Sequence, residues 1–131
     1  WDQPRQVFIY AAQSDPVKQS ALEAKGAQVI LLPGPGGKVD LAAMLSDLAR
    51  REVNEVHVEA GHKLNGSLVQ AGLIDEFLVY MAPKLIGPGR GLAQLPELAD
   101  LTGAVQLEFN TVERIGSDLR ITARPPGRDQ F

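Results

Sequence analysis

The residues best suited to chemistry lie between Glu55 and Gly72, in the stretch EVHVEAGHKLNGSLVQAG. Glu59 supplies a carboxylate, and Gly61 and Gly66 follow it at the start of a helical pattern. Glycine lets a backbone approach a ligand closely, and the unpaired N–H groups at a helix start favour an anion such as phosphate. We interpret the stretch as a phosphate-binding turn with a carboxylate beside it. The alternative is that the glycines serve tight packing and Glu59 is a hydrogen-bonded structural acid.

Two elements are needed to position these residues. Val56 and Val58 alternate with polar residues, which predicts a short strand ending at Glu59. Leu64, Leu68 and Ala71 share one helical stripe, and Gly72 is placed to end that helix. In an open parallel sheet, ligands bind outside the carboxyl ends of the strands, where this strand-turn-helix connection would lie.

The chain before this stretch predicts two further strand-helix pairs. Apolar runs at Val7 to Ala12 and Gln28 to Leu32 are typical of strands covered on both faces. Ser14, Asp15 and Pro16 predict a helix start, and that helix should end at Gly26. Asp40 should cap the next helix, whose charged end Arg50, Arg51 and Glu52 we interpret as solvated surface. A fourth strand is predicted from Ile74 to Met81, and together these elements indicate a parallel sheet with right-handed crossovers.

After Met81 the pattern changes. Ala82 to Gly91 is a predicted loop whose cations, Lys84 and Arg90, are explained most simply as surface charges, and Leu92 to Leu101 should be irregular. Two alternating runs around Gly116 and Ser117 predict an antiparallel hairpin, and the phase of Val112 indicates a bulge. The expected fold class is α/β, a mostly parallel sheet flanked by helices with a C-terminal antiparallel hairpin. We expect residues 1–131 to form a single domain.

Composition limits the classes of function. The chain has 131 residues, a net charge of −3 and no cysteine. These values argue against a general nucleic-acid or anionic-membrane binder and exclude disulfides and thiolate chemistry. The two histidines, His57 and His62, do not form a zinc motif, so no metal site is predicted. Because neither a membrane span nor a signal peptide is visible, we expect a cytoplasmic location.

A longer match surrounds the central stretch. VEAGHKLNGSLVQAGLIDEFLVYMAPKLIG, from Val58 to Gly87, and the later VERIGSDLRI, from Val112 to Ile121, resemble the reductase domain of the bifunctional riboflavin-biosynthesis deaminase/reductase. The shared elements are a strand ending in VEAG, a turn with L-x-G, then LIDE and APKLxG. The resemblance implies a dihydrofolate-reductase-like fold. It also implies NADPH-dependent reduction of the ribosyl group of 5-amino-6-(5-phosphoribosylamino)uracil to a ribityl chain.

The resemblance also implies roles for particular residues. Glu59 would contact the phosphoribosylaminopyrimidine substrate, and no catalytic proton donor is assigned. His62 and Lys63 depart from the family's pattern, where proline and a small polar residue are common, so the cofactor contacts expected here are main-chain ones. A homodimer is also implied. The residues expected to wrap NADPH are Gly61, His62, Lys63, Leu64, Asn65, Gly66 and Ser67.

The resemblance covers the C-terminal portion of the reductase domain, so the fold would be truncated at its N-terminus. The matching region includes neither the family's early cofactor and phosphate contacts nor its zinc-dependent deaminase domain. We therefore expect residues 1–131 alone to fold, to self-associate and to lack useful reductase activity. Two other functions fit the sequence. One is a dihydrofolate-reductase-like reductase with a pterin or another substrate, and the other is a non-catalytic nucleotide-binding module.

Overall fold

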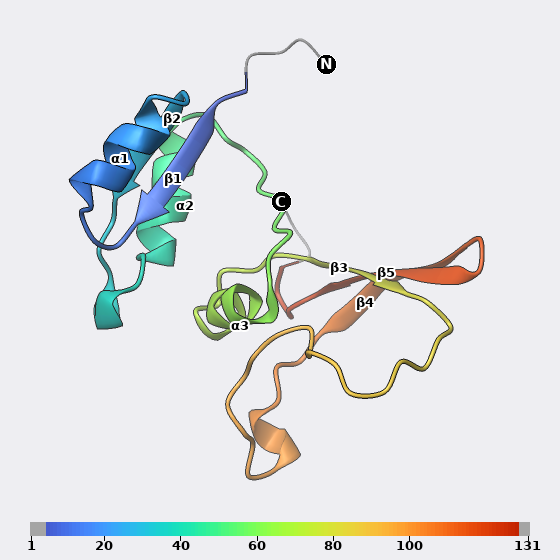
Figure 1. The fold of residues 1–131 in the computed structure, drawn as a ribbon. Coiled ribbons are helices and arrows are strands. Elements are labelled where there is room, and N and C mark those ends of the chain that lie inside the picture. Colours follow the sequence, from blue (N-terminus) through green and yellow to red (C-terminus); the bar gives the residue numbers. More distant parts are fainter. Residues whose placement is uncertain (1–4, 129–131) are drawn as a thin grey trace. The chain divides into compact units, whose positions relative to one another are not determined.

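The computed structural model describes residues 5–128, which fall into two compact units. Of the described residues, 5–57 form unit 1 and 58–128 form unit 2, and Figure 1 shows the elements of each. Within the described residues, no helix has both the length and the apolar character to cross a membrane.

Unit 1 has the order β1 (Val7–Ala11), α1 (Pro16–Glu23), β2 (Ala27–Leu31) and α2 (Leu41–Arg50), with a 3-10 turn at Pro35–Gly37 before α2. The two strands pair in parallel, as predicted, and Val7 lies opposite Ala27. Both helix starts are also confirmed. The Asp15 carboxylate accepts from the backbone N–H of Lys18 (3.1 Å), and the Asp40 carboxylate accepts from that of Ala43 (2.9 Å).

Each face of the β1–β2 pair is covered by a different helix. Successive strand residues point to opposite faces, so Ile9 and Val29 lie toward α1, where both line a pocket with Leu22. Tyr10 and Phe8 point the other way and contact residues at the end of α2. The apolar runs are therefore covered on both faces, which explains why they lack strict polar alternation.

Unit 2 consists of α3 (His62–Gln70), β3 (Phe77–Met81), a 3-10 turn (Leu101–Gly103), β4 (Glu108–Ile115) and β5 (Asp118–Arg124). Its sheet is antiparallel with the strand order β3-β5-β4. The predicted C-terminal hairpin is confirmed, and its register shifts between Phe109 and Thr111, which confirms the expected bulge. Leu68 of α3 and Ala123 of β5 are the core positions, each with 3% of its surface exposed.

The α/β class is confirmed, but two of the predicted parallel strands are not present as such. Residues 53–61, all within the described chain, form no strand, although Val56 and Val58 alternate as expected. The predicted fourth strand begins at Phe77 instead of Ile74 and runs antiparallel to β5. Alternation specifies which side chains share a face, whereas a strand also needs a neighbour for its N–H and C=O groups. Sequence pattern alone does not identify that neighbour.

Candidate functional site

Residues 61–67 are the beginning of α3, so the helix predicted after Gly61 is confirmed and the residues of the expected turn form its first two turns. Gly61 is the N-cap residue, with extended backbone angles, and the helix begins at His62. The structure thus brings all seven predicted cofactor residues together in two consecutive helical turns. Glu59 lies just before Gly61, on the exposed segment that forms no strand, so its predicted place at a strand end is wrong.

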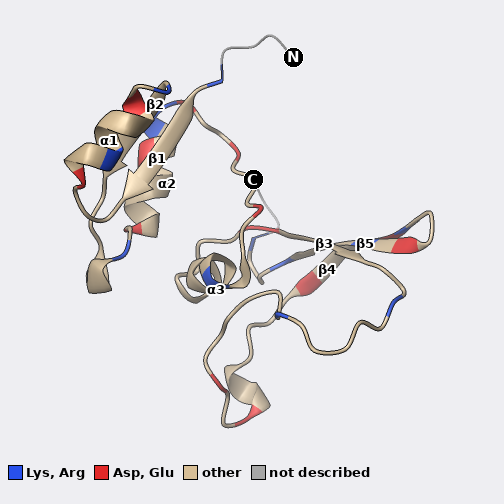
Figure 2. Ribbon diagram, in the orientation of Figure 1, with Lys and Arg blue, Asp and Glu red and all other residues tan. Residues whose placement is uncertain are grey.

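The start of α3 has the electrostatic character of an anion site. The N–H groups of Leu64 and Asn65 donate to the Gly61 carbonyl (3.1 and 3.2 Å), while the N–H groups before them have no acceptor within the helix. The first turn contains no acidic residue, and Lys63 is the charged residue of α3 visible in Figure 2. The positive end of the helix dipole and the Lys63 ammonium both favour a negatively charged group here.

Two side chains of this set are already used within the protein. The Asn65 amide donates to the carbonyl of Leu92 (3.0 Å), and the Ser67 hydroxyl donates to the carbonyl of Lys63 (3.1 Å). A ligand at this helix start would therefore meet mainly backbone N–H groups and the side chains of His62 and Lys63. The expectation that cofactor contacts here are made by the main chain stays a prediction.

Gly66 has a role that the sequence analysis did not anticipate. It is buried, and a Cβ atom added to it would lie 2.1 Å from the carbonyl oxygen of Gln94. Gly66 was expected to leave room for a ligand. The Gln94 backbone occupies that space instead. The sequence analysis described residues 92–101 only as irregular, and no local pattern indicates that Gln94 returns to α3.

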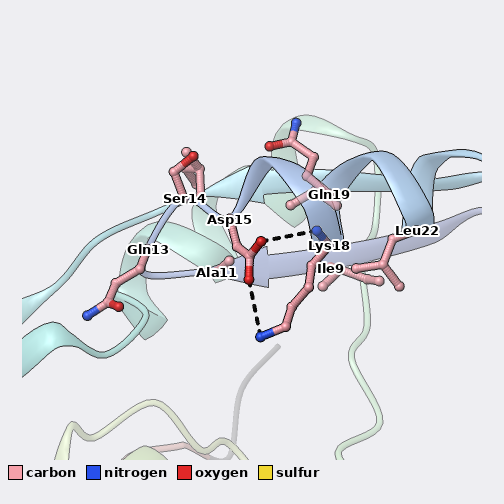
Figure 3. A pocket seen from close by; sticks show the side chains of 10 residues that line it. Ile9, Ala11, Gln13, Ser14, Asp15, Lys18, Gln19 and Leu22 are labelled. Atoms are coloured by element: carbon pink, nitrogen blue, oxygen red, sulfur yellow. Dashed lines mark hydrogen bonds and ion pairs between the residues drawn. The ribbon is translucent and has the colours of Figure 1, made fainter.

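Unit 1 contains an open pocket of about 360 Å³ that the sequence analysis missed. Apolar side chains of β1 and β2 line it, including Ala11 and Leu31 at the carboxyl ends of these strands. Figure 3 shows the Asp15–Lys18 ion pair at its edge, with the ammonium 3.2 Å from the carboxylate. The backbone N–H of Lys18 and then its side chain hold the pKa of Asp15 below the usual range. The signal that could have located this pocket is the general position of ligands at strand carboxyl ends.

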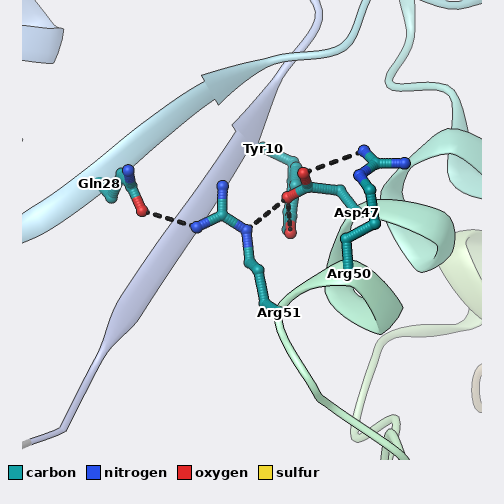
Figure 4. Close-up of polar contacts among 5 residues, drawn as sticks. All are labelled: Tyr10, Gln28, Asp47, Arg50 and Arg51. Carbon is teal, nitrogen blue, oxygen red and sulfur yellow. Dashed lines mark hydrogen bonds and ion pairs between the residues drawn. The ribbon is translucent and has the colours of Figure 1, made fainter.

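A second polar cluster in unit 1 joins α2 to the strands. The Asp47 carboxylate accepts from the Tyr10 hydroxyl (2.8 Å) and from Nε of Arg51 (2.7 Å), and Nη2 of Arg50 adds a bond of 3.1 Å (Figure 4). Arg51 also donates to the Gln28 side chain (2.9 Å). The hydrogen bonds from Arg51 and then Tyr10 lower the pKa of Asp47, while burial and the bond to Asp47 raise the pKa of Tyr10. Each of these groups has a partner within the protein, so we interpret the cluster as one that stabilises the fold.

Arg51 corrects one prediction. The charged end of α2 was interpreted as solvated surface, yet the Arg51 side chain is only 29% exposed and its guanidinium lies 4.5 Å from the centre of the Phe8 ring. This geometry allows a cation–π interaction. By contrast, Lys84 and Arg90 lie in a fully exposed run, residues 81–90. Within residues 5–128, no three histidine, aspartate or glutamate side chains gather in a metal-binding group.

Comparison with known proteins places the chain in the RibD C-terminal domain family. The model of the "RibD C-terminal domain" family matches residues 1–121. Riboflavin biosynthesis protein RibD of Escherichia coli is 37% identical over 118 residues, which is 89% of this chain and 31% of that protein. The 5-amino-6-(5-phosphoribosylamino)uracil reductase of Buchnera aphidicola is 35% identical over 67% of this chain and 43% of that protein.

Solved structures support the same fold. Form 2 of Acinetobacter baumannii RibD superposes with a TM-score of 0.76 and 22% sequence identity, covering 91% of this chain and 31% of that one. The chain thus spans less than half the length of each of these three relatives.

Proposed function

We propose that this chain forms part of an NADPH-dependent reductase of riboflavin synthesis. It belongs to the RibD C-terminal domain family. The reaction would reduce the ribosyl group of 5-amino-6-(5-phosphoribosylamino)uracil to the ribitylamino product. The observation that carries this proposal is the family match over residues 1–121, supported by a relative named as a reductase of that substrate. The same match supports treating residues 1–131 as part of one domain, since it extends across both units.

The proposed cofactor contacts are those of residues 61–67. The start of α3 fits a phosphate group of NADPH because Gly61 carries no side chain, the first turn has no acid, and Lys63 is basic. Leu64 is exposed beside these groups and offers an apolar surface. When bound, the nicotinamide would supply the hydride, and the protein would supply binding and orientation.

Glu59 is the proposed substrate contact. It is exposed and lies two residues before Gly61, the first residue assigned to the cofactor, within the same compact unit. A carboxylate accepts hydrogen bonds from sugar hydroxyl groups, and two such bonds would orient the ribosyl carbon that accepts hydride. We assign Glu59 no proton transfer.

The proposal also covers the binding partner, the cellular location and the oligomeric state. The partner is a small phosphorylated pyrimidine, and the location is the cytoplasm, where such a biosynthetic reductase would work. We further propose a homodimer. Exposed apolar side chains on β4, at the edge of the unit 2 sheet, support an association of this kind.

The test is oxidation of NADPH by the purified full-length protein with 5-amino-6-(5-phosphoribosylamino)uracil, followed at the nicotinamide absorbance. Substrate-dependent oxidation and a ribityl product are expected. NADPH binding with turnover of a pterin or another substrate instead would support the second reductase. NADPH binding without turnover of any of these would support a non-catalytic nucleotide-binding module.

A further inference from the structure

The beginning of α3 is held differently from the beginnings of α1 and α2. Those two helices start at Asp15 and Asp40, whose carboxylates accept hydrogen bonds from the first turn. At the corresponding position of α3, Gly61 has no side chain with which to cap the helix. A helix end without a cap is prone to fray, because its first N–H groups are not satisfied within the helix. The contact that holds this end comes from another part of unit 2.

Residues 92–94, which we call the docking segment, make that contact. The backbone N–H of Gln94 donates to the carbonyl of His62 (2.8 Å), and the carbonyl of Leu92 accepts from the Asn65 amide (3.0 Å). One turn further along, the Gln70 amide donates to the carbonyl of Gln94 (3.2 Å). The docking segment therefore makes hydrogen bonds along the whole of α3, from His62 to Gln70.

Gly66 explains how the docking segment comes so close. His62, Gly66 and Gln70 are spaced four residues apart, so they form one stripe along the helix. A Cβ atom at Gly66 would lie 2.1 Å from the oxygen of Gln94 and 2.8 Å from its carbonyl carbon, both backbone atoms. Only glycine leaves room for the Gln94 peptide unit on this stripe.

We propose that the docking segment is a positioning element that holds the uncapped start of α3 through a carbonyl and two side-chain amides, leaves its first N–H groups free and fixes its first two turns for cofactor binding. The positioning of α3 rests on the contacts above, and its consequence for NADPH rests on the proposed function. Main-chain N–H groups bind a phosphate well only when they are already oriented. NADPH, by binding the oriented form, should in turn stabilise the docked state of the segment.

Gly66→Ala separates this proposal from a simple change in helix propensity. Alanine is the better helix former, so propensity alone predicts a more stable α3 and slower amide exchange in its first turn. Displacement of the docking segment predicts the reverse. Gly89→Ala is the matched control, because a Cβ atom there meets nothing closer than 3.9 Å. Gln70→Ala is a milder variant that removes only the amide bond to Gln94 and keeps Gly66.

The experiment is hydrogen–deuterium exchange of the full-length protein, read in peptides covering residues 61–67 and 91–96, together with NADPH titration. Gly66→Ala should speed exchange in both peptides and raise the NADPH Kd, each by about tenfold or more. Gln70→Ala should produce smaller changes in the same directions, and Gly89→Ala should leave both quantities unchanged.

Three outcomes would decide the matter. Slower or unchanged exchange in residues 61–67, despite faster exchange in residues 91–96, would overturn the positioning role. Faster exchange in both peptides with an unaltered NADPH Kd would overturn the link to the cofactor. If the wild-type protein does not bind NADPH at all, the proposed function fails, and the exchange result for Gly66→Ala and Gln70→Ala still decides whether the docking segment positions α3.

Discussion

Gly61 and Gly66 belong to the same helix start but differ in what surrounds them. A Cβ atom at Gly61 would meet nothing within 4 Å, whereas one at Gly66 would collide with the Gln94 backbone. Gly61 also has a negative φ, so a larger residue is compatible with its backbone. A substitution at Gly61 therefore tests the space available to a ligand, and a substitution at Gly66 tests packing within the protein.

Gly61→Val should raise the Kd for NADPH by about tenfold or more while the protein stays folded, because the new side chain occupies the approach to the first N–H groups of α3. The measurement is a fluorescence titration with NADPH, with circular dichroism to confirm folding. Gly89→Val serves as the control in an open loop. An unchanged Kd in a folded Gly61→Val variant would remove the cofactor from this helix start.

Glu59→Gln should affect the substrate more than the cofactor. The change keeps the shape of the side chain and removes the charge that strengthens its hydrogen bonds. Such bonds contribute about 1.5–3 kcal/mol, so kcat/KM should fall by roughly ten- to a hundredfold while the NADPH Kd changes little. Steady-state kinetics and NADPH titration measure the two effects. Equal losses in both would show that Glu59 serves the cofactor, and no loss in either would make it a structural acid.

At the scale of elements, the Asp47 cluster ties the end of α2 to β1 and β2, and it should depend on pH. The pKa of Asp47 is lowered in the folded protein, so its contribution to stability is present above the unfolded-state pKa and disappears as pH falls through the folded-state value. Asp47→Asn should lower the Tm by several degrees at pH 7. The Tm difference between the variant and the wild-type protein should become smaller below about pH 4.

Thermal unfolding at pH 7 and at pH 3 measures this difference. The control is Glu113→Gln, which removes an ion pair with Arg120 whose two side chains are both more than two-fifths exposed. An exposed pair contributes little to stability, so the control should change the Tm only slightly. A Tm difference between wild type and Asp47→Asn that stays constant down to pH 3 would show that the charge of Asp47 does not stabilise this cluster.

Features encoded by neighbouring residues were predictable from the sequence. Asp15 and Asp40 cap their helices as expected, and the phase change at Val112 correctly indicated a bulge, because each depends on a few adjacent positions. Features that join distant parts of the chain were not predictable. The strand expected at Glu59 lacks a partner ladder, and the contact of Gln94 with Gly66 has no local signature. The residues of the candidate site and the helix that carries them were thus predicted, but the contact of that helix with Gln94 was not.

At the scale of the whole molecule, the edge strand β4 carries exposed apolar side chains. Phe109 is 75% exposed and Val112 is 56% exposed, and the bulge between them places both on one face of the unit 2 sheet. Exposed edges of this kind invite pairing with another chain. Light scattering after size exclusion should therefore give the mass of a dimer for the full-length protein. Phe109→Glu should shift it toward monomer, and a monomeric wild type would contradict the proposed homodimer.

The strand order β3-β5-β4 also has a consequence for how the protein folds during its synthesis. Both outer strands pair only with β5, which is the last of the three to leave the ribosome. The β1–β2 ladder needs nothing beyond Leu31, so unit 1 can form its sheet early in synthesis. In unit 2, no ladder of this sheet can begin before residues 118–124 have emerged, and until then the apolar residues of β3 have no strand partner. A nascent chain stalled before β5 should therefore be the form of this protein that depends most on chaperones.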